Sequence, residues 1–487
     1  MDGDRHVGGR TLARHLGSWR GEGSGVAYAE LADRITLLVL DGRLPTSTRL
    51  PAERELATAL ELSRTTVAAA YDQLRQAGFL HSRRGSGSWT TLPERRADTD
   101  MSPFAPTGDD SALDLAYASP PAPEAALSEA LAHAVEELPR YSAQSGYRLL
   151  GLEPLRAAVA GRFTARGLPT TPDQVLITCG AQHAITLVLA TLAQPGDRVL
   201  VEHPTYPNVL DAIAQARARA VPVGFAGAGW DLETMAAAVR DACPRFVYLI
   251  PDFHNPTGRS MSPAQRLEIL ELCRRTRTPL VIDETMSEVA LDGDPPPPLA
   301  GLAAGQGGVP LITVGSASKT FWGGLRIGWV RARRPVIDRI ARVRASMDIA
   351  SSVVDQLTVE HLVTHIGPVL EQRRRELRSA RDHLVELVGR QLPGWRAPVP
   401  PGGLSLWVDL GAPVSSALVA AAGRHGVQLA AGPRFGLDGA FERNLRLPYT
   451  LPEPKLSLAV QRLVAAWRAL PEQPAAPRWE PDPAEVA

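Results

Sequence analysis

Lysine is almost absent from this chain of 487 residues. Of its 52 basic residues only Lys319 and Lys455 are lysines, so arginine serves nearly everywhere that a positive charge suffices. Lys319 follows an apolar run at residues 311–314 and lies among small residues and glycines. Arginine keeps its proton, whereas a desolvated lysine can lose it, and only the neutral amine attacks a carbonyl group. Lys319 is therefore a candidate for covalent carbonyl chemistry; a surface lysine retained by chance is the alternative.

Cysteine and long apolar runs are scarce as well. Cys179, Cys243 and Cys273 lie far apart and form no C-x-x-C pair, which argues against a disulfide framework and a zinc site. No apolar run approaches the ~20 residues that a membrane span needs. Residues 1–5 contain no apolar core of a secretion signal. We therefore expect a cytoplasmic protein with no metal site and no membrane partner.

A net charge is also missing. The 52 basic residues are balanced by 52 acidic ones, so the whole chain is not a general polyanion binder. The balance is not uniform, because residues 1–96 have a small excess of arginine that is concentrated late, at Arg83, Arg84, Arg95 and Arg96. The length and the 44% hydrophobic content favour two or three domains with a large buried core.

The first hundred residues favour a small helical domain followed by a β-hairpin. Apolar periodicity predicts helices over residues 28–40, 53–60 and 64–77, with Ser63 as N-cap of the third. The last two of these, joined by a tight turn, are typical of a helix-turn-helix. Residues 79–91 then predict a hairpin, or wing, with a basic, glycine-rich tip.

These residue types suit DNA. Arg64 and Thr66 lie at the start of the third helix, where a recognition helix meets base edges in the major groove. Arg54 on the second helix would reach a phosphate, and Arg84 of the wing would follow the backbone or a minor groove. A small helical domain that binds another protein is the alternative.

Three motifs in this region resemble the winged helix of GntR-family transcription regulators. They are LPAERELA at residues 50–57, SRTTV at 63–67, and GFL at 78–80 followed by RGSG at 84–87. The resemblance covers about residues 26–92. It implies operator DNA as a partner, with contacts from Arg54, Arg64, Thr66 and Gly87. Ala52 stands where the family often has serine, so we expect a helix cap to be lost there.

Residues 93–112 contain three prolines among charged and small residues and predict a linker. Beyond residue 150 short apolar runs alternate with helical patterns. Strands are expected at residues 175–178, 199–202, 246–250, 280–283 and 311–314, and helices at 181–193, 208–218, 232–242 and 263–275. This alternation predicts an α/β fold with a mostly parallel sheet that is covered on both faces.

Polar residues follow the ends of these strands, where open α/β sheets bind ligands. Each has a role around an aldehyde cofactor with a phosphate and a pyridine ring. The phosphate would accept hydrogen bonds from the backbone N–H groups of Gly180, Ala181 and Gln182. Arg326 would add a positive charge, and Ser316 and Ser318 would add hydroxyl donors. Tyr206 would stack on the ring, Asp283 would keep the pyridine nitrogen protonated, and Asn255 would donate to the ring hydroxyl oxygen. Each residue alone has an ordinary structural explanation; the ordered set is the signal.

The same set resembles fold-type I pyridoxal 5′-phosphate aminotransferases, over about residues 113–470. The matching motifs are GAQ at 180–182, EHPTY at 202–206, HNPTG at 254–258, Asp283, SASK at 316–319 with Arg326, and RNLRL at 443–447. The resemblance implies a mostly parallel seven-stranded sheet in a large domain, a small α+β domain, and cofactor attachment at Lys319. It also implies that Arg446 binds a substrate or effector α-carboxylate, and that Tyr147 reaches the phosphate of a partner subunit.

A GntR-type winged helix fused to such a domain resembles the MocR-type regulators as a whole. This layout implies a homodimer that senses pyridoxal phosphate, or an amino acid or amine effector, through an aldimine at Lys319. Two alternatives stay open: a working aminotransferase whose winged helix controls its own gene, and a binding module that ignores the cofactor. Thr285 stands where the family commonly has a tyrosine that donates to the ring hydroxyl oxygen. We therefore expect cofactor binding with slow or absent transamination.

The C-terminal region is expected to complete the small domain. Helical patterning over residues 336–391 predicts one long helix that links the two domains. Residues 404–410 alternate like a strand, and residues 454–469 predict a closing amphipathic helix. The proline-rich tail at residues 471–487 is expected to be disordered.

Overall fold

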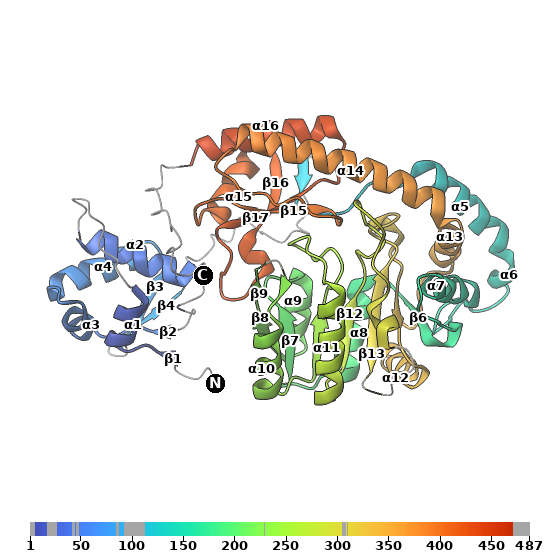
Figure 1. Cartoon of the computed structure of the whole chain (residues 1–487), viewed down its shortest axis with the longest axis horizontal. Coiled ribbons are helices and arrows are strands. Elements are labelled where there is room, and N and C mark those ends of the chain that lie inside the picture. The colour runs from blue at the N-terminus through green and yellow to red at the C-terminus, as the bar shows by residue number, and fades with distance from the viewer. Residues whose placement is uncertain are drawn as a thin grey trace.

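The computed structural model describes residues 5–16, 27–40, 44, 48–83, 87–91, 113–227, 229–303, 308 and 310–470 (Figure 1). Three predictions lie outside these residues: the linker at 93–112, the wing tip at 84–86 with Arg84, and the tail at 471–487.

The N-terminal region folds as a winged helix. Its elements are β1 (Arg5–His6), α1 (Gly9–Leu16), α2 (Ala27–Leu40), β2 (Thr48–Arg49), α3 (Glu53–Leu60), α4 (Arg64–Gln76), β3 (Leu80–Arg83) and β4 (Gly87–Thr90). The strands pair in the order β1-β2-β4-β3. Ser63 caps α4, because its Oγ accepts from Thr66 N at 3.0 Å. No side chain caps α3, whose N-cap is Ala52, as the sequence predicts.

A segment ahead of the predicted start at residue 26 also contributes to this domain. Leu12 and Leu16 of α1 are fully buried in the same apolar cluster as α2, α3 and α4. Gly9 N donates to Glu55 Oε1 at 2.6 Å, which ties the start of α1 to α3. The sequence pattern missed α1, because eight residues contain too few apolar positions to define a period.

A seven-stranded sheet forms the centre of the large domain. Its strands are β6 (Val175–Thr178), β7 (Arg198–Glu202), β8 (Arg219–Val223), β11 (Phe246–Leu249), β12 (Leu280–Asp283), β13 (Leu311–Ser316) and β14 (Gly328–Arg331), in the order β6-β14-β13-β12-β11-β7-β8. The pairings are parallel except those of β14, which is antiparallel to β13 and to β6. The expected mostly parallel, seven-stranded sheet is confirmed.

Helices cover both faces of this sheet. One apolar layer packs α8 (Ala181–Leu192), α9 (Pro207–Gln215) and α12 (Arg334–Arg344) against it. The opposite layer contains α5 (Glu124–Glu137), α7 (Glu153–Ala165), α10 (Leu232–Ala242), α11 (Pro263–Thr276) and α13 (Val353–Thr364). Shorter elements complete the domain: α6 (Pro139–Ser142), the hairpin β9 (Phe225–Ala226) and β10 (Gly229–Trp230), and the 3-10 helices η1 (Pro172–Gln174), η2 (Leu299–Ala303) and η3 (Gly323–Leu325).

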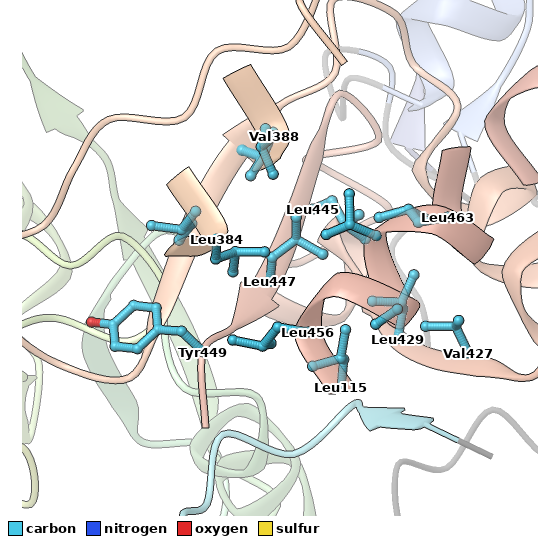
Figure 2. Close-up of a cluster of buried hydrophobic side chains, with 14 of the residues drawn as sticks. Leu115, Leu384, Val388, Val427, Leu429, Leu445, Leu447, Tyr449, Leu456 and Leu463 are labelled. Carbon is cyan, nitrogen blue, oxygen red and sulfur yellow. The ribbon is translucent and has the colours of Figure 1, made fainter. Parts of the chain in front are cut away.

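The small domain is an α+β layer with its own core. Its sheet has the order β15-β17-β16-β5, formed by β5 (Leu113–Leu115), β15 (Ser405–Asp409), β16 (Val427–Ala431) and β17 (Asn444–Pro448). The helices α14 (Ile366–Gln391), α15 (Ser415–Arg424) and α16 (Glu453–Arg468) accompany it, with η4 (Gly432–Phe435). Figure 2 shows this core, in which Leu384 of α14, Leu447 of β17 and Leu456 of α16 meet.

The single long helix predicted over residues 336–391 is wrong. The structure divides this stretch into α12, α13 and α14, and only α14 leads from the large domain to the small one (Figure 1). The first interruption contains Ile349, whose φ of 65° lies in the left-handed region that helices exclude. The sequence pattern missed this interruption because residues 345–352 contain no proline or glycine to mark a break in the helix.

Cys179, Cys243 and Cys273 are all free thiols. Among the residues that the structure describes, no helix combines the length and the hydropathy of a membrane span.

Candidate functional site

The residues predicted around the cofactor line one cavity of about 690 Å³, except Gly180, which directly precedes the lining residue Ala181. It lies beyond the carboxyl ends of the parallel strands and is closed on one side by the small domain. Its lining includes Ala181, Gln182, Tyr206, Asn255, Asp283, Ser316, Ser318, Lys319 and Arg326 from the large domain and Arg446 from β17. The structure therefore brings together groups that are up to 265 residues apart in the chain.

One end of the cavity is a close approach of glycine and arginine. Gly180 precedes α8 with φ of 86°, a left-handed conformation that favours glycine. A Cβ at this position would lie 2.9 Å from Nη2 of Arg326. Arg326 itself adopts φ of 50° and donates to Cys179 O at 3.1 Å. The first N–H groups of α8 have no acceptor within the helix, so cationic and N–H donors converge here.

Two serines and a glutamine border the same end. Ser316 Oγ donates to Ser318 Oγ at 2.9 Å and accepts from Ser318 N at 3.2 Å. Gln182 Nε2 donates to Asn208 O at 3.2 Å, whereas its Oε1 is buried without a hydrogen-bond partner. A buried amide oxygen without a donor costs free energy unless a ligand or water completes it.

Asp283, which also lines the cavity, terminates β12. Its carboxylate is only 5% exposed. Tyr248 Oη donates to Asp283 Oδ2 at 2.6 Å, and Thr285 N donates to Oδ1 at 2.9 Å. Burial raises the pKa of Asp283 above its usual value. Sequence reasoning missed Tyr248, because no motif around this buried strand indicates that its hydroxyl has a functional partner.

Tyr206 and Asn255 face the same space. Tyr206 Oη accepts from Asn208 Nδ2 at 3.0 Å, and burial raises the pKa of Tyr206 to about 12, so the hydroxyl keeps its proton. Asn255 Oδ1 accepts from Arg446 Nη1 at 3.2 Å. Thr285 lines the cavity and also borders a smaller one, of about 40 Å³, that extends toward Trp329.

Asn255 follows a buried pair that sequence reasoning did not single out. Glu202 and His254 are both inaccessible, and His254 Nε2 lies 3.2 Å from Glu202 Oε2. Glu202 also accepts from Trp230 Nε1 at 2.6 Å and from Ile250 N at 2.9 Å. These donors fix the chain just ahead of Asn255. Both residues stand in the motifs EHPTY and HNPTG, which was the available signal.

Lys319 lies in the cavity with its amine directed at the backbone. Nζ donates to Ala118 O at 2.8 Å. Burial, reinforced by the positive charges of Arg446 and Arg326, lowers the pKa of Lys319 to about 8, although Asp283 opposes this shift. An appreciable fraction of the amine is therefore neutral near pH 7, unlike that of an exposed lysine.

Arg446 of β17 is a buried cation of the small domain. It is 7% exposed, donates to Ala116 O, and lies with its guanidinium carbon 4.8 Å from the centre of the Phe435 ring. Burial lowers the pKa of Arg446 to about 10, so the side chain stays charged at neutral pH. Its Nε is buried without a hydrogen-bond partner, which leaves one donor for a ligand.

Tyr147 does not line this cavity and is 68% exposed. The predicted contact of Tyr147 is with the phosphate of a partner subunit, and it stays a prediction.

Near the cavity, Cys179, His183 and Asp348 place three potential ligand atoms within 4.8 Å of one another. The carboxylate of Asp348 already forms an ion pair with Arg344, whose Nε lies 2.7 Å from Asp348 Oδ1. The group is thus an internal ion-pair network in this structure.

The predicted DNA contacts lie on the outside of the winged helix. Arg54 of α3 and Arg64 at the start of α4 are exposed, and Thr66 is partly exposed. Arg64 makes only a loose ion pair with Glu53, at 3.4 Å. Gly87 opens β4 with φ of 124°, and a Cβ there would lie 2.8 Å from Arg49 Nε. Arg49, which sequence reasoning did not name, therefore lies directly beneath the wing.

Comparisons with known proteins address the two regions separately. The sequence model of aminotransferase class I and II matches residues 115–463, and that of the bacterial regulatory proteins of the gntR family matches residues 27–89. The uncharacterized HTH-type transcriptional regulator YisV of Bacillus subtilis is 27% identical over 444 residues, which cover 85% of this chain and 90% of YisV. The probable rhizopine catabolism regulatory protein MocR of Rhizobium meliloti is 29% identical over 398 residues, which cover 76% of this chain and 78% of MocR.

A solved structure extends the comparison to the fold. LysN, an α-aminoadipate aminotransferase of Thermus thermophilus complexed with N-(5′-phosphopyridoxyl)-L-leucine, matches with a TM-score of 0.68 at 29% identity, over 74% of this chain and 92% of LysN. The aminotransferase fold implies dependence on pyridoxal phosphate, and the gntR match indicates DNA binding. The chain thus belongs to the aminotransferase class I and II family and, with a GntR-type domain ahead of that region, to the MocR-type transcriptional regulators.

Proposed function

We propose that this protein is a DNA-binding transcription regulator whose aminotransferase-like domain binds pyridoxal phosphate at Lys319 and senses the cofactor or an amino compound bound with it. The observation that carries this proposal is the meeting of Lys319, Asp283 and Arg326 in one cavity of a chain that also has a winged helix.

The residues of the cavity fit the cofactor along its length. Arg326, Ser316, Ser318 and the N-terminus of α8 would hold the phosphate, and the glycine at position 180 leaves room for that approach. The buried Gln182 Oε1 lacks a donor at the same end. Asp283 would keep the pyridine nitrogen protonated, with Tyr206 against the ring and Asn255 near its hydroxyl oxygen. Bound pyridoxal phosphate would supply an aldehyde for exchange of amines and a ring that withdraws electrons.

Lys319 would supply the attachment point. Its lowered pKa, about 8, makes the neutral amine accessible at physiological pH. Its hydrogen bond to Ala118 O would hold the amine toward the segment that follows β5.

Arg446 would select effectors that carry a carboxylate. Its unpartnered Nε and its contact with Asn255 leave it facing the cofactor cavity rather than solvent. A carboxylate would form a charge-assisted hydrogen bond there, which is stronger than a bond between neutral groups.

Operator DNA would be read by the winged helix. Arg64 and Thr66 would contact bases from the start of α4, whereas Arg54, Gly87 and the wing residue Arg84 would contact the backbone. We keep residues 26–92 and 113–470 as the proposed domain boundaries and add α1 to the first domain because of its shared core.

A homodimer would complete the regulator. α5 and α13 pack side by side. Exposed apolar side chains occur on these two helices and in the loop ahead of α13: Leu131, Val135, Met347, Ile349 and Val354. Such surfaces mark protein interfaces. Tyr147, exposed near the same helices, would then be free to reach the cofactor phosphate of the partner.

A working aminotransferase is the second candidate, favoured by the likeness to LysN over 74% of the chain. Thr285 argues against efficient turnover, because its short side chain replaces a ring hydroxyl donor at the cofactor.

The proposal is tested with the purified full-length chain in two assays. Borohydride reduction in the presence of pyridoxal phosphate should fix the cofactor to Lys319, as seen by peptide mass mapping. Selection from random duplexes should return one sequence motif with two related half-sites. Failure of covalent fixation removes the cofactor part of the proposal, and failure to enrich any motif removes the DNA part.

A further inference from the structure

Tyr248 and Asp283 reach each other across two neighbouring strands. β11 and β12 are parallel, with Tyr248 opposite Val281. Side chains alternate along a strand, so Tyr248, Val281 and Asp283 point to the same face of the sheet. The hydroxyl of Tyr248 then lies 2.6 Å from Asp283 Oδ2. The contact is a consequence of the strand register, not of a mobile loop.

Both oxygens of Asp283 are thereby fixed by donors from different elements. Tyr248 holds Oδ2, and the backbone N–H of Thr285 holds Oδ1 at 2.9 Å. Two donors set the plane of the carboxylate as well as its position. A buried tyrosine that merely needs a partner takes a backbone carbonyl, as Tyr449 does when its Oη donates to Gly402 O at 3.2 Å. Tyr248 instead donates to an acid.

The surroundings of Asp283 make such a donor consequential. Burial disfavours its charged form and raises its pKa, and the nearby Glu202 acts in the same direction. Asp283 also interacts electrostatically with Tyr206 and Lys319. Burial raises the pKa of Tyr248 well above its ordinary value, so its hydroxyl remains a donor across the pH range in which the protein is folded. A charge-assisted hydrogen bond stabilises the carboxylate against both influences.

We propose that Tyr248 is a positioning residue for the cofactor: through its hydrogen bond it orients Asp283 and keeps that carboxylate charged, ready for the protonated pyridine nitrogen. This inference rests on the proposed binding of pyridoxal phosphate at Lys319. Tyr248 does not line the cavity and acts only through Asp283.

The test compares Tyr248→Phe with Tyr449→Phe in the full-length protein. Both tyrosines are buried, at 1% and 0% exposure, and each variant removes one hydroxyl. The readouts are the dissociation constant of pyridoxal phosphate and the pH midpoint of the visible absorption change of the bound cofactor. Tyr248→Phe should weaken binding about tenfold, the size expected for a hydrogen bond to a charged group, and shift the midpoint. Tyr449→Phe should change neither.

A double-mutant cycle with Asp283→Asn separates positioning from packing. If Tyr248 acts through Asp283, its substitution should have no further effect on cofactor affinity in the Asp283→Asn background. Unchanged affinity and midpoint in a folded Tyr248→Phe protein would overturn the inference, and so would equal losses in both backgrounds. If Tyr248→Phe unfolds, Tyr248→Leu, which also removes the donor to Asp283, takes its place in the same cycle. A wild-type protein that fixes no cofactor at Lys319 would overturn the proposed function first, and this inference with it.

Discussion

In the winged helix the predicted contacts Arg54 and Arg64 are exposed and stand at the starts of adjacent helices, α3 and α4. In the aminotransferase-like domain the predicted contacts Asp283 and Arg446 are buried and come from different sheets of two domains. A DNA-binding surface exposes its cations to the phosphates of the duplex. A cofactor site buries its ionisable groups, because burial shifts their pKa values. We therefore expect substitutions in the buried cavity to affect cofactor binding and substitutions in the winged helix to affect operator binding.

The largest effect is expected at the buried site. Lys319→Ala should abolish cofactor that borohydride fixes to the protein, because no other amine lies in the cavity lining. Lys455→Ala is the matched control: it removes the only other lysine of the chain, which is exposed on α16. Mass spectrometry of the reduced proteins measures both. Unchanged fixation in Lys319→Ala would show that the attachment point is wrong.

The next effect is expected at the exposed site. Arg64→Ala should weaken binding to the selected operator by ~1–3 kcal/mol and relax base preference at one position. Arg75→Ala is its control, since Arg75 lies at the far end of the same helix and pairs with Asp72 at 2.5 Å. Fluorescence anisotropy with operator and scrambled duplexes separates the two. Equal losses for both variants would make α4 an ordinary basic helix.

A substitution at Arg446 tests whether this side chain recognises the carboxylate of an effector. Arg446→Gln should weaken the response to amino acids about tenfold or more, by loss of a charge-assisted hydrogen bond, while amines without a carboxylate respond as before. Absorption titrations of the cofactor-loaded protein measure this. Arg443→Gln is the control and should behave as wild type, because Arg443 precedes β17 and its Nη2 donates to Gly411 O at 2.7 Å. A parallel loss for amines and amino acids would contradict a carboxylate-specific role.

The pH dependence of cofactor capture distinguishes the buried lysine from an exposed one. Since only the neutral amine reacts and the pKa of Lys319 is lowered to about 8 by burial, the capture rate should rise with pH and level off above that value. Stopped-flow absorbance with pyridoxal phosphate follows the rate. A rise that continues toward pH 10 would mean that Lys319 behaves as an ordinary exposed lysine.

The smallest effect is expected at Thr285. The wild-type protein should show slow or no amino transfer over many turnovers, and Thr285→Tyr should raise it only a few-fold, since about one hydrogen bond is added. Thr285→Phe, which fills the same space without a hydroxyl, is the control. Ketoacid formation detected by mass spectrometry provides the measurement. Robust turnover by the wild type would instead favour the enzyme.

The two regions also differ in how much of them could be predicted from sequence. The limits of α2, α3 and α4 were predicted to within one residue, because caps and apolar periods are local. In the large domain β8 and β14 were missed: β8 contains Pro222 at an edge, and β14 is a four-residue strand that begins at a glycine. These two strands are identified only by their hydrogen-bonded pairing with β7, β13 and β6 in the structure.

The candidate site shows the same limit. Lys319, Asp283 and Asn255 could be named because motifs mark them, and the structure brings them to one cavity. Tyr248 and the pair of Glu202 with His254 could not be assigned roles, since their partners lie on other strands. Strand register, which no local pattern encodes, decides which of these side chains meet.

The most direct test of the proposed regulator is the affinity of the full-length protein for its selected operator, measured with and without pyridoxal phosphate, for the wild type and for Lys319→Ala. If Lys319 links the two regions, the cofactor changes operator affinity of the wild type, and this change is absent from Lys319→Ala while Lys455→Ala retains it. An operator affinity that the cofactor leaves unchanged, or changes equally in all three proteins, would contradict a sensor built on Lys319.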